Sequence, residues 1–254
     1  MNRATKSGIA QLLLLLTLTV IATLMLEHSQ WDVRISELFY SDGHWLLEKG
    51  AQPYRFLFYD GPKLLLILFG IYLLMISIWR YRQRPHSNAN TTVIKPSLLK
   101  PTAALSGREI GYLLLVIIVV PTIIATLKSV THVSCPNHLY LFNGDLPYLS
   151  IWQNIVAKTD AKCFPAAHAS AGFALYGLAY LPTLQRYRMR IFIIVTALGW
   201  IMGLYKMAFG DHFFSHTLVS MLLAWSLACG LAMLFFAKVD LTKAENMKFD
   251  PIIK

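Results

Sequence analysis

Six apolar runs divide the chain, and they limit its fold more than any other feature. The runs cover residues 8–26, 64–79, 110–127, 166–184, 191–205 and 213–237. The first has 19 residues without a charged side chain, and about 20 apolar residues are enough for a helix to cross a bilayer. The second and fifth runs are short, so we expect them to extend into flanking residues or to tilt. The pattern predicts an all-α polytopic membrane protein, a bundle of six transmembrane helices in one domain, 1–254.

The composition argues against two other classes of protein. Hydrophobic residues make up 56% of the chain, the mean hydropathy is +0.51 and 14% of the residues are charged, whereas a soluble domain carries about 25% charged residues. This excludes a disordered chain and disfavours an ordinary soluble domain. The run 8–26 resembles the apolar part of a signal peptide, but no small-residue cleavage site follows it. We therefore interpret it as a retained helix.

The basic excess follows the expected topology. The net charge is +10, and the cytoplasmic segments of membrane proteins are enriched in Lys and Arg. With the N-terminus inside, the inner segments hold 15 of the 23 basic residues, while nine of the 13 acidic residues fall in the outer segments. The charge thus reflects orientation, and nucleic acid is not an expected partner. We expect a bacterial inner-membrane protein with both termini cytoplasmic and with periplasmic segments 27–63, 128–165 and 206–212. The first of these is rich in aromatic residues and predicts one or two interfacial helices.

Ionisable residues gather where the expected spans meet the periplasmic segments. Such residues are costly to bury in a membrane, which makes them candidates for function. Lys128 follows the third span and His168 begins the fourth. Lys206, His212 and His216 lie where the fifth span ends and the sixth begins. All of them fall on the outer side, so a bundle of hairpins could bring them together in one site.

These residue types suit the transfer of a phosphoryl group. Lysine ammonium groups bind phosphate as point charges, and free amides of Ala166, Ala167 and His168 at a helix start would add an anion site. Histidines can act as nucleophile and general acid near neutral pH. His212 and His216 are four residues apart, so on a helix they share a face and one can orient the other. The set predicts metal-free phosphoryl transfer through a phosphohistidine.

Three stretches resemble the motifs of the type 2 phosphatidic acid phosphatase superfamily, whose pattern is K-x6-R-P, P-S-G-H and S-R-x5-H-x3-D. Residues 128–136 are K-S-V-T-H-V-S-C-P, residues 165–168 are P-A-A-H, and residues 205–216 are Y-K-M-A-F-G-D-H-F-F-S-H. Their order and spacing match the pattern, and so do both of its histidines. The C-P, C-F-P-A-A-H and H-x3-H forms also resemble a variant subgroup of the superfamily.

The resemblance implies a role for each matching position. His212 corresponds to the nucleophile that takes the phosphoryl group, and His168 to the acid that protonates the leaving oxygen. Lys128 and Lys206 correspond to cations that hold the phosphate, and His216 stands in place of an Asp that orients the nucleophile. The chain departs from the pattern in six places, which are Cys135 and Lys206 for Arg, Ala166 and Tyr205 for Ser, Ala167 for Gly and His216 for Asp. The loss of two guanidinium groups removes bidentate phosphate binding, and His216 supplies no negative charge.

Cys135 and Cys163 flank the first two motifs, and both fall in the segment 128–165. Because the periplasm oxidises thiols, we predict a disulfide between them, worth about 3–4 kcal/mol on the chain-entropy model. The bridge would tie the first motif to the second. Cys229 lies within the last span and is interpreted as a packing residue, and His138 is expected to be a solvated loop residue.

The implied activity is that of a lipid phosphatase without a cofactor, acting on a phosphate monoester or diphosphate of a membrane lipid. Candidate substrates are undecaprenyl diphosphate, a lipid A phosphate and a glycerophospholipid phosphate. If a lipid hydroxyl or phosphate replaces water, the same site is a phosphotransferase. Three other interpretations stay open: a catalytically weak scaffold, a small transporter, and a metal enzyme in which His212 and His216 bind zinc with His168 or Asp211. Otherwise Asp211 is expected to be a turn residue or a helix cap.

Overall fold

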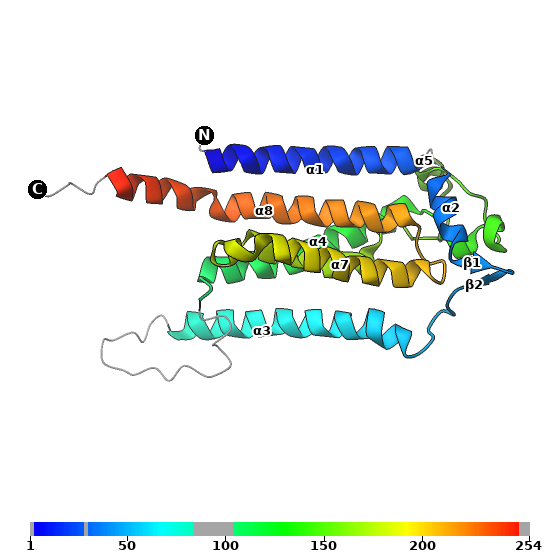
Figure 1. The fold of residues 1–254 in the computed structure, drawn as a ribbon, viewed down its shortest axis with the longest axis horizontal. Coiled ribbons are helices and arrows are strands. Elements are labelled where there is room, and N and C mark those ends of the chain that lie inside the picture. The colour runs from blue at the N-terminus through cyan, green and yellow to red at the C-terminus, as the bar shows by residue number, and fades with distance from the viewer. Residues whose placement is uncertain (1–2, 28–29, 84–103, 249–254) are drawn as a thin grey trace, which may run out of the picture.

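Five long apolar helices run side by side along the molecule (Figure 1). The computed structural model describes residues 3–27, 30–83 and 104–248. The helices are α1 (Arg3–Glu27), α3 (Gly61–Gln83), α4 (Gly107–Thr131), α7 (Arg188–Met207) and α8 (Phe214–Lys248). Within the described ranges, these five helices are long and apolar enough to cross a bilayer. The expected all-α bundle of a polytopic membrane protein is confirmed, while the boundaries of the single domain stay a prediction.

The fourth apolar run, 166–184, differs from the others. It forms a short α-helix, α6 (Ala167–Phe173), followed by the 3-10 helices η6 (Ala174–Tyr180) and η7 (Pro182–Tyr187). In Figure 1, α7 begins at the end of the bundle opposite to the one where α4 finishes, so α6 and η6 return along the bundle. A 3-10 helix rises about 2.0 Å per residue against about 1.5 Å in an α-helix, so a given number of residues covers more distance. Six crossings remain a prediction.

Small residues let α6, α7 and α8 approach one another closely. A Cβ atom at Gly199 would overlap the ring of Phe173, and one at Gly203 would overlap the side chain of Thr217. Close backbone contact over small residues is typical of helices packed in membranes. The main core lies between these helices, α4 and η6, and includes the fully buried Phe173 and Tyr176. This packing sets the relative positions of the helices that carry the second and third motifs.

Helices α1 and α3 lie at the edges of the bundle in Figure 1, and they expose many apolar side chains. Leu13 and Leu65, for example, are 59% and 68% exposed. Such long apolar faces are rare on soluble proteins, whereas in a bilayer they contact lipid tails. The start of α1 and the end of α8 lie at the same end of the bundle. The terminal residues themselves, and the segment 84–103 between α3 and α4, lie outside the described residues.

The opposite end of the bundle, which we call the loop end, carries the shorter elements (Figure 1). These are α2 (Trp31–Glu37), the hairpin of β1 (Tyr40–Ser41) and β2 (His44–Trp45), the π-helix η1 (Phe56–Asp60), the 3-10 turns η4 (Pro136–His138) and η5 (Tyr140–Phe142), and α5 (Ile151–Ala157). The expected interfacial helices of segment 27–63 are thus one short α-helix and one π-helical turn that continues into α3. A small apolar cluster around Val33, Leu139, Phe142 and Phe213 packs these segments together.

A buried carboxylate joins the loop end to the start of α8. The two oxygens of Asp32 accept hydrogen bonds from Ser215, one from its backbone N–H at 2.9 Å and one from its hydroxyl. The first N–H groups of a helix lack partners within the helix, so Asp32 acts as a cap supplied by a distant segment. Burial raises the pKa of Asp32, and the hydrogen bonds from Ser215 oppose this shift.

Candidate active site

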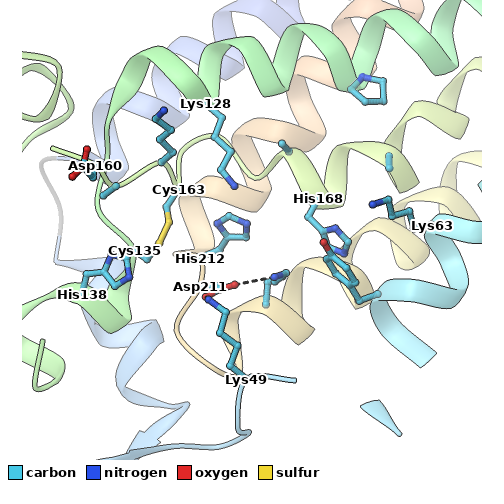
Figure 2. A pocket seen from close by; sticks show the side chains of 17 residues that line it. Lys49, Lys63, Lys128, Cys135, His138, Asp160, Cys163, His168, Asp211 and His212 are labelled. Carbon is cyan, nitrogen blue, oxygen red and sulfur yellow. Dashed lines mark hydrogen bonds and ion pairs between the residues drawn. A yellow bond between two sulfur atoms is a disulfide. The ribbon is translucent and has the colours of Figure 1, made fainter. Parts of the chain in front are cut away.

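The three motifs meet around one cavity of about 560 Å³ at the loop end of the bundle (Figure 2). Helix α4 supplies Lys128, and α6 supplies His168. The end of α7 and the turn after it supply Lys206, Asp211 and His212. Figure 2 shows Lys128 pointing from its helix toward His212. The segments that the sequence analysis expects to converge therefore do so.

Positive charge exceeds negative charge around this cavity. Five lysines and two aspartates line it, namely Lys49, Lys63, Lys128, Lys162, Lys206, Asp160 and Asp211. Asp211 pairs with two of the lysines, at 2.8 Å from Lys206 Nζ and 3.2 Å from Lys49 Nζ. In the part of the chain that the structure describes, the other three lysines have no ion pair with a carboxylate, and no arginine lines the cavity. The cavity therefore favours an anion, which it would hold with ammonium groups.

His168 is held by the segment that precedes α3. Its ring stacks on the ring of Tyr59, with centroids 4.0 Å apart and planes at 21°. The His168 ring also hydrogen-bonds the backbone of Phe58, while its Nε2 is buried without a hydrogen-bond partner. One ring nitrogen is thus engaged by the backbone, and the other is left for a ligand in the cavity.

His212 and His216 are neighbours, but they do not share a helix face as the sequence analysis expects. Helix α8 begins at Phe214, so His212 lies in the turn before it. The two rings meet edge to face with centroids 5.7 Å apart, and Nδ1 of each is buried without a hydrogen-bond partner. His212 lines the large cavity, whereas His216 lines a separate cavity of about 30 Å³ together with Asp32. Burial lowers the pKa of His212 well below its usual range, and positive charge on neighbouring side chains lowers it further.

A disulfide joins Cys135 to Cys163, as the sequence analysis predicts, with their Cα atoms 5.3 Å apart. The N–H of Cys163 donates to the carbonyl of Val133 at 2.9 Å. The ring of His216 also hydrogen-bonds the backbone of Cys163, and since the Cys163 N–H is already engaged, the ring is the donor and the carbonyl is the acceptor. The bridge thus connects the first motif to the second and supports the position of His216.

The PAP2 superfamily model, that of the type 2 phosphatidic acid phosphatases, matches residues 109–240, which is more than half of the chain. The chain belongs to this superfamily. The matched region contains all three motifs, so the resemblance to the superfamily is confirmed, while the variant subgroup stays a prediction. Comparisons with curated proteins and with solved structures give no match. PAP2 proteins are generally phosphatases, and membership gives this chain a phosphatase-type activity at a membrane, that of a phosphoric-ester hydrolase.

One backbone amide of the second PAP2 motif that we expect to bind phosphate is already hydrogen-bonded within the protein. Helix α6 begins at Ala167, and the N–H of Ala166 donates to the carbonyl of His216 at 3.1 Å. Ala166 is fully buried and does not line the cavity, whereas Ala167 does. The expectation of a free Ala166 amide is therefore wrong, because the hydrogen bond that joins the second motif to the third uses it.

The three motifs assign no role to several of the residues that line the cavity. Lys49, Tyr59 and Lys63 come from the segment before the region matched to PAP2. The one signal for them in the sequence is the placement of basic residues in an aromatic-rich outer segment. His138 is exposed, as expected, and it also lines the cavity. Asp211 does form a turn, since its N–H bonds a carbonyl of α7, but its carboxylate binds lysines of the cavity.

The zinc interpretation of the H-x3-H spacing needs both imidazole rings to face one ion. His212 and His216 line different cavities. Within the described ranges, no group of three or more His, Cys, Asp or Glu side chains is arranged to hold a metal ion. The effect of a chelator on activity tests the metal interpretation directly.

Proposed function

We propose that this PAP2 protein is a lipid phosphatase of a bacterial inner membrane, with its active site at the periplasmic face. The observation that carries the proposal is the single cavity in which His168 and His212 meet an excess of lysines. The lysines and histidines of the cavity can bind a phosphate headgroup, and the apolar helices next to it can contact the attached lipid tail. The enrichment of Lys and Arg in the segments expected at the other end supports the orientation.

His212 is the proposed nucleophile. Its lowered pKa keeps the imidazole neutral near pH 7, so a ring nitrogen carries a free electron pair. Because Nδ1 is buried, Nε2 attacks phosphorus, and a P–N bond forms as the P–O bond to the lipid breaks. Water then attacks the phosphohistidine, which releases inorganic phosphate and restores His212.

His168 is the proposed acid and base. Its Nε2 has no hydrogen-bond partner, and it is the nitrogen that exchanges protons with the reactants. The protonated ring gives this proton to the leaving oxygen of the lipid in the first step. In the second step it takes a proton from the attacking water, so the cycle returns the ring to its starting state.

Lys128 and Lys206 are proposed to bind the phosphate oxygens. Fixed positive groups placed where negative charge develops usually contribute most to the stabilisation of such a transition state. An ammonium group binds as a point charge and lacks the planar, bidentate geometry of a guanidinium. Lys49, Lys63 and Lys162 add to the positive charge of the cavity, which offsets the absence of arginine among its described residues.

His216 is proposed to orient His212. Its ring donates one N–H to the carbonyl of Cys163, so its other nitrogen is an acceptor. The two histidine rings lie with centroids 5.7 Å apart, and the buried Nδ1 of each is without a hydrogen-bond partner in the described part of the chain, so the Nδ1 proton of His212 is free for this acceptor. The PAP2 pattern has an Asp at this position. His216 then orients His212 as that Asp would, but it adds no negative charge.

The proposed substrate is a phosphate monoester or diphosphate of a membrane lipid. Undecaprenyl diphosphate, a lipid A phosphate and a glycerophospholipid phosphate all present such a group at the outer leaflet. The test is a panel of these lipids given to the purified protein in detergent, with phosphate release measured in the presence of a chelator. We expect release that survives the chelator, that is lost in His212→Ala, and that persists in the control His44→Ala, which removes an exposed histidine of β2.

Each of the other outcomes of this experiment indicates a different function for the protein. Release that the chelator abolishes indicates a metal enzyme. Transfer of the phosphoryl group to an added lipid acceptor, with little free phosphate, indicates a phosphotransferase. No reaction with any lipid of the panel indicates a scaffold that keeps the PAP2 fold.

A further inference from the structure

Two consecutive residues outside the region matched to PAP2 hold His168. They belong to η1, a π-helical turn directly before α3, and such turns are frequent at functional sites. The ring of Tyr59 stacks on His168 with centroids 4.0 Å apart, and the backbone of Phe58 hydrogen-bonds the same imidazole. The Tyr59 ring centroid also lies 4.8 Å from Nζ of Lys206. One aromatic ring therefore contacts two groups of the site, which come from α6 and from α7.

We propose that Tyr59 is a positioning residue that aims Nε2 of His168 at the leaving oxygen of the substrate. The inference rests on the proposed function, in which His168 supplies the proton. It adds a residue that the PAP2 motifs do not contain, because Tyr59 lies well before residue 109, where the match begins.

The physical basis is the freedom of an imidazole ring about its second side-chain torsion, which has a broad, roughly two-fold energy profile. Flipping the His168 ring would break its hydrogen bond to the backbone of Phe58. Tilting it would break the stack on Tyr59. With both contacts in place, Nε2 keeps one direction, and proton transfer depends on a donor held within hydrogen-bond reach of its target. A small displacement of such a group lowers the rate strongly.

The contact with Lys206 extends the effect to phosphate binding. The ammonium group lies over the faces of Tyr59 and Phe209, with centroids 4.8 Å and 4.9 Å away, and also pairs with Asp211. A cation over an aromatic face is attracted by the ring quadrupole. Tyr59 thus helps to set the spacing between the proton donor and a cation that binds the phosphate. These contacts use the ring rather than the hydroxyl, so phenylalanine can replace tyrosine.

The test compares two leaving groups in one set of variants. An alkyl phosphate lipid needs its leaving oxygen protonated, whereas nitrophenyl phosphate releases a stable anion without that proton. We expect Tyr59→Leu to lower kcat on the alkyl phosphate about tenfold or more, with a much smaller loss on nitrophenyl phosphate. Tyr59→Phe should restore the wild-type ratio of the two rates. Tyr54→Leu is the matched control, because Tyr54 is 43% exposed and does not line the cavity.

The other results overturn the inference. Equal losses on both substrates would show a general structural effect of Tyr59, and unchanged rates in Tyr59→Leu would show no effect at all. If Tyr59→Leu does not fold, Tyr59→Gln gives the same comparison without an aromatic face. Wild-type protein that releases no phosphate from the alkyl lipid would instead contradict the proposed function, so the two failures are distinguishable.

Discussion

The backbone N–H of Ala166 donates to the carbonyl of His216, with 3.1 Å between nitrogen and oxygen. This hydrogen bond joins the residue before α6 to the first turn of α8, two segments that are far apart in the sequence. His168 follows Ala166 by two residues, and His212 precedes His216 by four. One backbone contact thus helps to set the spacing of the two histidines proposed for catalysis.

The first prediction concerns the replacement of Asp by His in the third motif. We expect His216→Asp to keep or raise kcat, because a carboxylate at this position would accept the Nδ1 proton of His212 and also stabilise its cationic, phosphorylated form. His216→Leu should lower kcat, because it removes the acceptor. Steady-state kinetics on one lipid phosphate measures both. Complete inactivity of His216→Asp in a folded protein would contradict the orienting role.

The second prediction concerns the disulfide between Cys135 and Cys163. Unfolded, non-reduced protein should take up one alkyl group, at Cys229, and reduced protein should take up three. The variant Cys135→Ser should lose about 2–4 kcal/mol of unfolding free energy, and its kcat should fall because the carbonyl of Cys163 holds His216. Mass spectrometry after alkylation decides the pairing. Three labelled thiols without reductant would contradict it.

The sequence predicts the features that depend on composition along the chain. Apolar runs mark the five long helices, because a span must be apolar along most of its length. Motif spacing predicts that Lys128, His168, Lys206 and His212 belong to one site. Each motif lies at a helix end, and these helix ends lie at the same end of the bundle. The pair of cysteines in one outer segment predicts the disulfide, because thiols on that side of the membrane are expected to be oxidised.

The features that the sequence does not predict arise from contacts between distant segments. The run 166–184 is as apolar as the others, yet it forms a short α-helix followed by 3-10 helices. The amide of Ala166 is satisfied by a carbonyl of α8, which no local pattern indicates. Tyr59 and Lys49 reach the cavity from a segment whose hairpin and π-helical turn have no periodic signal. His212 lies in the turn before α8, because the helix begins only at Phe214.

The third prediction concerns the lysines of the cavity. We expect Lys128→Ala to lower kcat/KM about 100-fold or more, in the range found for removal of one group that stabilises transition-state charge. Lys128→Arg should retain part of the activity, since the positive charge remains. Arg34→Ala is the control, because this exposed residue of α2 lies at the same end of the bundle but does not line the cavity. Equal values of kcat/KM for Lys128→Ala and the control would show that Lys128 does not bind the phosphate.

The fourth prediction concerns the stability of the protein at acid pH. Burial lowers the pKa of His212 below its usual range, so the unfolded chain binds a proton at this residue at a higher pH than the folded protein. The stabilisation from His212 is therefore complete above about pH 6.5, the usual histidine value, and is lost as the pH falls toward the lowered pKa. Thermal unfolding in detergent should show a falling midpoint below pH 6.5, with a shallower fall in His212→Gln. Equal slopes for the two proteins would contradict the lowered pKa.

The central claim is that the phosphoryl group passes through His212, and trapping of the intermediate tests it most directly. The protein is mixed with a radiolabelled lipid phosphate, quenched in alkali, which preserves phosphohistidine, and digested for peptide mapping. We expect label on the peptide that contains His212, absent in His212→Ala and present in His44→Ala. Turnover without labelled protein, or label on a residue other than His212, would contradict the account.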